Sequence, residues 1–177
     1  MMAVLEKAQL PVSLAEAQAY VRIETGEEEA LLAGMLRVAT DICERFTGRA
    51  LIRRPFTEIL PASGRWARLE AFPVTQMDGV ASVDPDGTRT PLAMSQYAVD
   101  VDAEGGGWVR LITGNEASRV EVSGVAGMAE EPNGVPEPIR QGLIRLVAHL
   151  FAHRDGEDGA PPAAVTALWR PYRRVQL

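Results

Sequence analysis

The middle of the chain, about residues 56 to 130, is patterned differently from its two ends. It consists of short apolar runs separated by turn residues, among them Asp84-Pro85-Asp86-Gly87 and Glu104-Gly105-Gly106-Gly107, which is typical of strands joined by hairpins. The two ends instead place apolar residues three and four positions apart, as amphipathic helices do. Because strands follow one another without helices between them, the pattern predicts an α+β fold with an antiparallel sheet and excludes a doubly wound nucleotide-binding fold.

Six runs in this middle segment favour strands. They span residues 56–60, 66–70, 79–83, 97–100, 108–112 and 119–123. We expect these strands to be antiparallel and to lie side by side in the order of the sequence.

Two capping boxes mark the start of the N-terminal helices. Ser13-Leu14-Ala15-Glu16 and Thr25-Gly26-Glu27-Glu28 each place a hydroxyl at the cap and a Glu three residues later. They predict one helix over about 13 to 22 and a second that starts near 26 and ends at Gly48, a C-terminal cap. The second helix should turn an apolar stripe to the core, formed by Leu31, Met35, Val38, Ala39, Ile42 and Phe46.

Two further helices are expected after the sheet. Pro136 or Pro138 lies in the first turn of a helix that runs to about His153, and a short helix led by Pro161-Pro162 follows. The longer of the two should present Ile139, Leu143, Leu146, Val147, Leu150 and Phe151 to the core.

With 177 residues, the chain is long enough for one ordinary core. We therefore expect a single domain over 1–177, a bundle of about four helices with a β insertion between the second and third. The helical parts cover about 1–55 and 131–177, and the insertion covers about 56–130.

The charge and composition of the chain limit its partners. A net charge of −6 provides no basic field to hold phosphates, so nonspecific binding of nucleic acid is disfavoured. The single cysteine, Cys43, cannot form an internal disulfide, which favours a reducing compartment. The start of the chain does not resemble a signal peptide, and no apolar run is long enough to span a membrane.

The residues that most often carry catalysis or bind metals do not form a recognisable motif. His149 and His153 are four apart, but Leu150 stands where a zinc protease motif needs Glu. The Gly105-Gly106-Gly107 run lacks the Lys-Ser/Thr of a phosphate loop, and Ser123 is not in a nucleophile elbow. We expect no catalytic residue, no metal and no cofactor; a hydrolase of an unrecognised type is a remote alternative.

The C-terminal residues have the composition of a binding anchor. Trp169, Arg170, Tyr172, Arg173 and Arg174 follow one another closely, and no acidic residue occurs after Asp158. Aromatic rings supply contact area at low entropic cost, and Arg supplies paired hydrogen-bond donors. One interpretation is that this tail docks onto a partner. The other is that Trp169 and Tyr172 fold back onto the protein's own core, and both stay open from the sequence.

Three segments together resemble the head-to-tail connector (adaptor) proteins of tailed bacteriophages and of phage-like gene transfer agents. They are Val12–Ala17 through Thr25, the junction Phe46-Thr47-Gly48-Arg49-Ala50-Leu51-Ile52, and Val135–Arg154 with the terminal Pro171-Tyr172-Arg173. The resemblance covers nearly the whole chain, in order. It marks Phe46, Gly48 and Arg49 as structural residues of the junction.

The resemblance implies a structural virion protein that is not an enzyme. Such proteins form a ring, usually of about twelve copies, below the portal protein of a DNA-filled head, and their C-terminal segments reach into the portal. The implied partners are the portal, other copies of the chain and a tail-side stopper or tail terminator protein. DNA would pass through the channel without sequence-specific binding, which suits an acidic body. The implied location is the neck of a virion or gene transfer agent particle assembled in the bacterial cytoplasm, away from any membrane.

A second hypothesis is a soluble, non-enzymatic binding module whose β part holds a peptide or small ligand. Whether the particle is a phage or a gene transfer agent stays open, as do the ring number, the host, the tail-side partner and the role of the β insertion.

Overall fold

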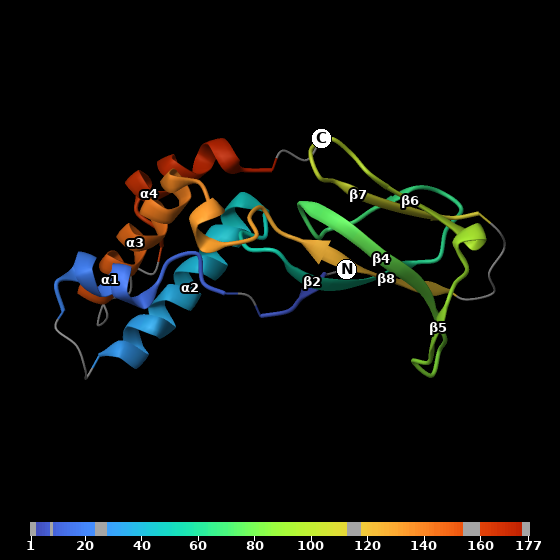
Figure 1. The fold of residues 1–177 in the computed structure, drawn as a ribbon, viewed down its shortest axis with the longest axis horizontal. Coiled ribbons are helices and arrows are strands. Elements are labelled where there is room, and N and C mark those ends of the chain that lie inside the picture. The colour runs from blue at the N-terminus through green and yellow to red at the C-terminus, as the bar shows by residue number, and fades with distance from the viewer. Residues whose placement is uncertain (1–2, 8, 24–27, 113–117, 154–159, 175–177) are drawn as a thin grey trace. The chain divides into compact units, whose positions relative to one another are not determined.

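The chain folds into a helical unit and a β unit, which the computed structural model describes over residues 3–7, 9–23, 28–112, 118–153 and 160–174. The helical unit comprises the described residues of Gln9–Ile52 and Ala129–Leu177, and the β unit comprises those of Met1–Ala8 and Arg53–Met128 (Figure 1). The predicted α+β class and the placement of the insertion are confirmed. That both units behave as one domain stays a prediction.

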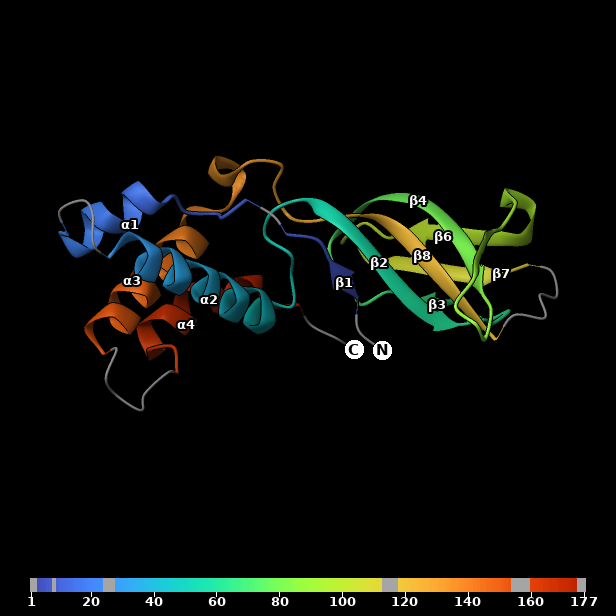
Figure 2. The same cartoon turned by 90° about the horizontal axis from the view of Figure 1, so that it is seen from below.

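The described part of the helical unit contains the four expected α-helices. These are α1 (Leu14–Val21), α2 (Glu29–Thr47), α3 (Glu137–Ala152) and α4 (Ala163–Trp169), with single 3-10 turns at Pro132–Gly134 and Arg170–Tyr172. Helices α2 and α3 each contact the other three, and their contact with each other is the most extensive in the bundle (Figure 2).

Helix α1 starts as its sequence predicts. The Ser13 hydroxyl accepts the Glu16 N–H at 3.2 Å, and the Glu16 carboxylate accepts the Ser13 N–H at 2.8 Å, which completes the capping box. The bonds that the Glu16 carboxylate accepts from the Ser13 N–H and hydroxyl, together with the charge of Arg140, lower the pKa of Glu16. Most of the second predicted box, Thr25-Gly26-Glu27, falls outside the described residues.

Helix α2 buries a different face from the predicted one. Ala39 is buried as expected, but Leu31 is 42% exposed and Val38 is 48% exposed, so the predicted stripe is wrong at those two positions. The buried residues are Leu32, Leu36, Ala39, Cys43 and Thr47. The apolar arc of α2 is wider than the surface that its neighbours cover, and periodicity does not indicate which edge of a wide arc is left in solvent.

Helix α3 follows its predicted pattern more closely. Ile139, Leu143, Leu146 and Val147 are buried as expected, together with Gly142 and Ile144. Leu150 and Phe151, at the end of the predicted stripe, are only half-buried.

The β unit consists of two antiparallel sheets. The larger has the order β1-β2-β8-β4-β5, and the smaller has the order β3-β7-β6. The strands are β1 (Val4–Leu5), β2 (Arg54–Pro61), β3 (Ala67–Arg68), β4 (Val74–Val83), β5 (Arg89–Pro91), β6 (Tyr97–Val101), β7 (Gly107–Leu111) and β8 (Arg119–Ala126). The predicted hairpins at Asp84–Gly87 and Glu104–Gly107 join β4 to β5 and β6 to β7, and both pairs are antiparallel as expected.

The expectation that all strands pair in sequence order is wrong. Strand β8, the last along the chain, lies between β2 and β4 and pairs with both. Turn residues predict only pairs that a short hairpin connects, so they carry no information on this long-range pairing.

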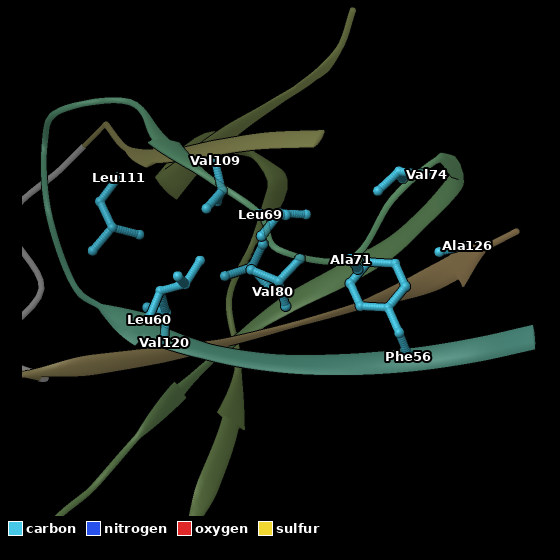
Figure 3. Packing of buried hydrophobic residues seen from close by; sticks show 11 residues of the cluster. Phe56, Leu60, Leu69, Ala71, Val74, Val80, Val109, Leu111, Val120 and Ala126 are labelled. Atoms are coloured by element: carbon cyan, nitrogen blue, oxygen red, sulfur yellow. The ribbon is translucent and has the colours of Figure 1, made fainter. Parts of the chain in front are cut away.

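The core of the β unit lies between the two sheets (Figure 3). Phe56 and Leu60 point inward from β2, Val120 from β8 and Val109 from β7, each 3% exposed or less. Inward and outward residues alternate along β2 and β8, as expected for strands with one buried face.

A carboxylate, Glu58, shares this inward face and is only 1% exposed. Both of its oxygens accept the Glu70 N–H at 3.0 Å, and one accepts the Ala71 N–H at 3.2 Å. Burial raises the pKa of Glu58, while these two backbone donors act against the rise. Glu58 thus links β2 to the segment that precedes β4.

Candidate interaction surface at the C-terminal segment

Gly48 ends α2 in the way that its position predicts. Its φ of 66° and ψ of 28° are left-handed, and its N–H donates to the Glu44 carbonyl at 2.8 Å. Just before it, the buried Thr47 donates its hydroxyl to the Cys43 carbonyl at 2.8 Å. The backbone therefore turns sharply at Gly48, which places Arg49 beside the end of the helix.

The C-terminal segment, defined here as residues 170–174, crosses this turn. Arg49 Nε donates to the Tyr172 carbonyl at 2.7 Å, and the Arg174 N–H donates to the Thr47 carbonyl at 2.7 Å. Burial lowers the pKa of Arg49, yet a guanidinium in a protein keeps its charge and its donors. The junction that carried the family resemblance is thus the part of the helical unit that holds the end of the described chain.

Trp169 packs into the core of its own unit. It is 0% exposed, its indole Nε1 donates to the Ile139 carbonyl at 3.2 Å, and its ring lies 6.0 Å from that of Phe46, centroid to centroid. Gly142 on α3 provides the space, because a Cβ there would lie 2.8 Å from Cε2 of the indole. For Trp169 the fold-back interpretation is therefore correct, and the docking tail loses its largest side chain as a direct contact.

The other predicted tail residues remain at the surface to different degrees. Arg170 and Arg173 are exposed, whereas Tyr172 and Arg174 are half-buried. The guanidinium carbon of Arg173 lies 5.8 Å from the centre of the Phe46 ring, within cation–π range. Phe46 is itself only half-buried, so it links the core to the tail rather than lying deep in the bundle. Docking of residues 170–174 stays a prediction.

The motifs set aside for catalysis or metal binding do not form such a site in the described residues. The rings of His149 and His153 lie 4.4 Å apart at the end of α3, and His153 Nδ1 is 2.9 Å from the His149 carbonyl oxygen. Within the described ranges, no group of three or more His, Cys, Asp or Glu residues is placed to hold a metal ion. The acidic residues 155, 157 and 158 fall outside those ranges.

The glycine run forms a turn, as its context predicts. Asp102 accepts the Gly106 N–H at 2.6 Å and the Trp108 indole N–H at 3.2 Å, and these bonds lower the pKa of Asp102. A carboxylate that fills the turn leaves its N–H groups unavailable to a phosphate. Elsewhere, Cys43 is buried in α2, where burial raises the pKa of its thiol.

The binding-module hypothesis would place its ligand on the larger sheet. A shallow pocket there is lined by side chains that include Thr57, Ile59, Arg89 and Glu121. Arg89 and Glu121 pair with each other at 2.8 Å, and Arg119 lines the same pocket, so one positive charge remains beyond this ion pair. Among the residues described, no helix has both the length and the apolar character needed to cross a membrane.

Comparisons with known proteins point to one kind of assembly. No protein-family model matches the chain, and neither does any curated protein. Solved structures do match it, over 100% of this chain and 97% of theirs. A chain from the neck of an empty gene transfer agent particle, computed with C6 symmetry, has a TM-score of 0.80 and 29% identity. Chains from a native gene transfer agent virion and from a native neck computed with C12 symmetry each have a TM-score of 0.78 and 27% identity.

These matches span both the helical unit and the β unit, because they cover the whole chain. They support a structural protein of the particle neck. The resemblance inferred from the junction and its flanking helices is therefore confirmed: over its full length the chain is similar to chains of gene transfer agent necks, as a head-tail connector protein would be.

Proposed function

We propose that this protein forms a ring in the neck of a phage-like particle, below the portal, where it joins the DNA-filled head to the tail. The observation that carries the proposal is the full-length similarity to chains of gene transfer agent necks, with TM-scores from 0.78 to 0.80. This role requires no catalytic residue and no cofactor. Its site of assembly would be the bacterial cytoplasm and its final location the neck.

A ring of identical copies is supported by the symmetry of the matched structures. Two of them were computed with C6 and C12 symmetry, and we infer a ring of twelve. A cyclic ring larger than a dimer needs two different, complementary surfaces on every copy. Leu31 and Val38, which α2 leaves 42% and 48% exposed, supply an apolar surface on one side. We assign it to the contact with the neighbouring copy.

Docking to the portal is assigned to the C-terminal segment. Arg170 and Arg173 are exposed there, and Tyr172 is half-buried. Arg side chains pair well with carboxylates and with backbone carbonyls, so the expected partner surface is acidic or rich in exposed carbonyls. The opposite end of the ring would meet the stopper or tail terminator protein.

DNA would pass through the channel of this ring without being held. A chain with a net charge of −6 gives a ring with strong negative charge, which repels phosphates at distances up to about the Debye length of 8–10 Å. A conduit benefits from this repulsion because attraction would slow the DNA.

The proposal is tested by locating the protein on purified particles. An affinity tag at the N-terminus, labelled with gold and viewed by electron microscopy, is expected at the junction of head and tail. Label spread over the capsid surface, or confined to the distal tip of the tail, would contradict the proposal. The same tag on a known capsid protein serves as the control for accessibility.

A further inference from the structure

The C-terminal segment is fixed on both sides of Arg173 by hydrogen bonds of opposite direction. Tyr172 accepts from the Arg49 side chain, and Arg174 donates to the Thr47 carbonyl, each at 2.7 Å. Arg173 between them is extended, with φ of −66° and ψ of 128°. Two hydrogen bonds to neighbouring peptide groups fix the direction of a chain, whereas a single hydrogen bond would leave the chain free to rotate about it.

Gly48 is required for this crossing by its backbone and by its lack of a side chain. A φ of 66° is unfavourable for other residues, and a Cβ there would lie 3.3 Å from Cβ of Arg174. The same residue therefore ends α2 and lets the C-terminal segment pass close to the helix end.

We propose that Thr47, Gly48 and Arg49 form a clamp that sets the direction in which the C-terminal segment is presented to its partner. This inference rests on the proposed docking of that segment to the portal. In a ring, every copy must present its tail in the same orientation to a partner with a fixed surface. A tail that is already held in place loses less conformational freedom on binding, so the clamp strengthens docking without contacting the portal.

Arg49 is the residue of the clamp that can be changed without altering the backbone. In Arg49→Met the aliphatic stem is kept and the donor to Tyr172 is lost. Arg45→Met is the matched control, because Arg45 lies in the last turn of α2, close to the clamp in sequence, and its described hydrogen bond is to the Asp41 carbonyl, one turn before it. In Arg49→Lys a single charged donor remains, and this variant is expected to recover part of the wild-type behaviour.

The first measurement is hydrogen exchange at the Arg174 amide, resolved by NMR. In Arg49→Met we expect exchange at Arg174 to rise by about tenfold or more, the effect of losing a hydrogen bond from a charged donor. Exchange at Leu143 and Val147, in the buried part of α3, should stay as in the wild type. Unchanged exchange at Arg174 would overturn the clamp.

The second measurement is binding to purified portal rings, compared among the wild type, Arg49→Met, Arg45→Met and a chain that ends at Trp169. We expect Arg49→Met to bind more weakly than the wild type, Arg45→Met to bind equally and the truncated chain to show the largest loss. If truncation abolishes binding but Arg49→Met binds as the wild type does, the clamp has no positioning role and the inference is wrong. If truncation leaves binding intact, the proposed docking is wrong. The hydrogen exchange of the Arg174 amide then decides by itself whether the clamp exists.

Discussion

Replacing Trp169 with Ala should destabilise the helical unit strongly. Trp169 is 0% exposed, so the full transfer free energy of its indole is lost, together with the hydrogen bond to the Ile139 carbonyl. The cavity should collapse poorly, because Gly142 opposite has no side chain with which to fill it. Truncation of a fully buried large aromatic residue costs about 3–5 kcal/mol, a large part of the roughly 5–15 kcal/mol that stabilises an ordinary domain.

Thermal unfolding followed by helical circular dichroism measures this loss. For a unit of this size each kcal/mol lowers Tm by roughly 4–8 °C, so a decrease of at least about 12 °C is expected. Trp169→Phe, which keeps an aromatic ring, should lose less. A chain that ends at Trp169 should keep its helices, since it retains the indole. If Trp169→Ala melts like the wild type, the indole is not a core residue and the docking interpretation of the whole tail returns.

Three further perturbations test other parts of the structure. Gly142→Ala should lower Tm because the added Cβ meets the Trp169 ring, although Ala is the better helix former by about 0.8–1.0 kcal/mol. A variant more stable than the wild type would show that the indole can move aside. Between the unfolded and the raised folded pKa of Glu58 the wild type should lose stability as pH rises, because the folded state binds the extra proton, and Glu58→Gln should lack this loss. Equal pH slopes of unfolding free energy in the wild type and Glu58→Gln would contradict this assignment. Val38→Glu should leave Tm nearly unchanged but prevent association of copies in sedimentation experiments. Arg37→Glu, at the neighbouring exposed position, is the control. Normal assembly of Val38→Glu would exclude α2 from the ring contact.

Local features of the fold were readable from the sequence. The capping box at Ser13, the C-terminal cap at Gly48 and the two hairpin turns each depend on residues within a few positions of one another, and the structure contains all of them. The pairing of β8 with β2 and β4 depends on contacts between distant segments. No turn residue encodes it, so the strand order could not be predicted in this way.

The C-terminal region shows the same division between local and distant information. The composition of the tail fits a buried core residue as well as an exposed anchor, since Trp is common in both. What distinguishes them for Trp169 is Gly142, a residue on another helix whose lack of a Cβ admits the indole. The clamp at Thr47 was missed because it involves main-chain groups, although the Thr-Gly-Arg junction marked its location. Glu58 could have been found, because it stands between Phe56 and Leu60 on the apolar face of an alternating strand.

The most direct test of the proposed function is electron microscopy of particles from cells that lack this protein. A connector is required to attach a tail after the head is filled, so we expect DNA-filled or leaking heads without tails. A copy of the wild-type gene should restore tailed particles, whereas a copy that ends at Trp169 should not. Normal numbers of tailed particles in the absence of the protein would contradict a role in the neck.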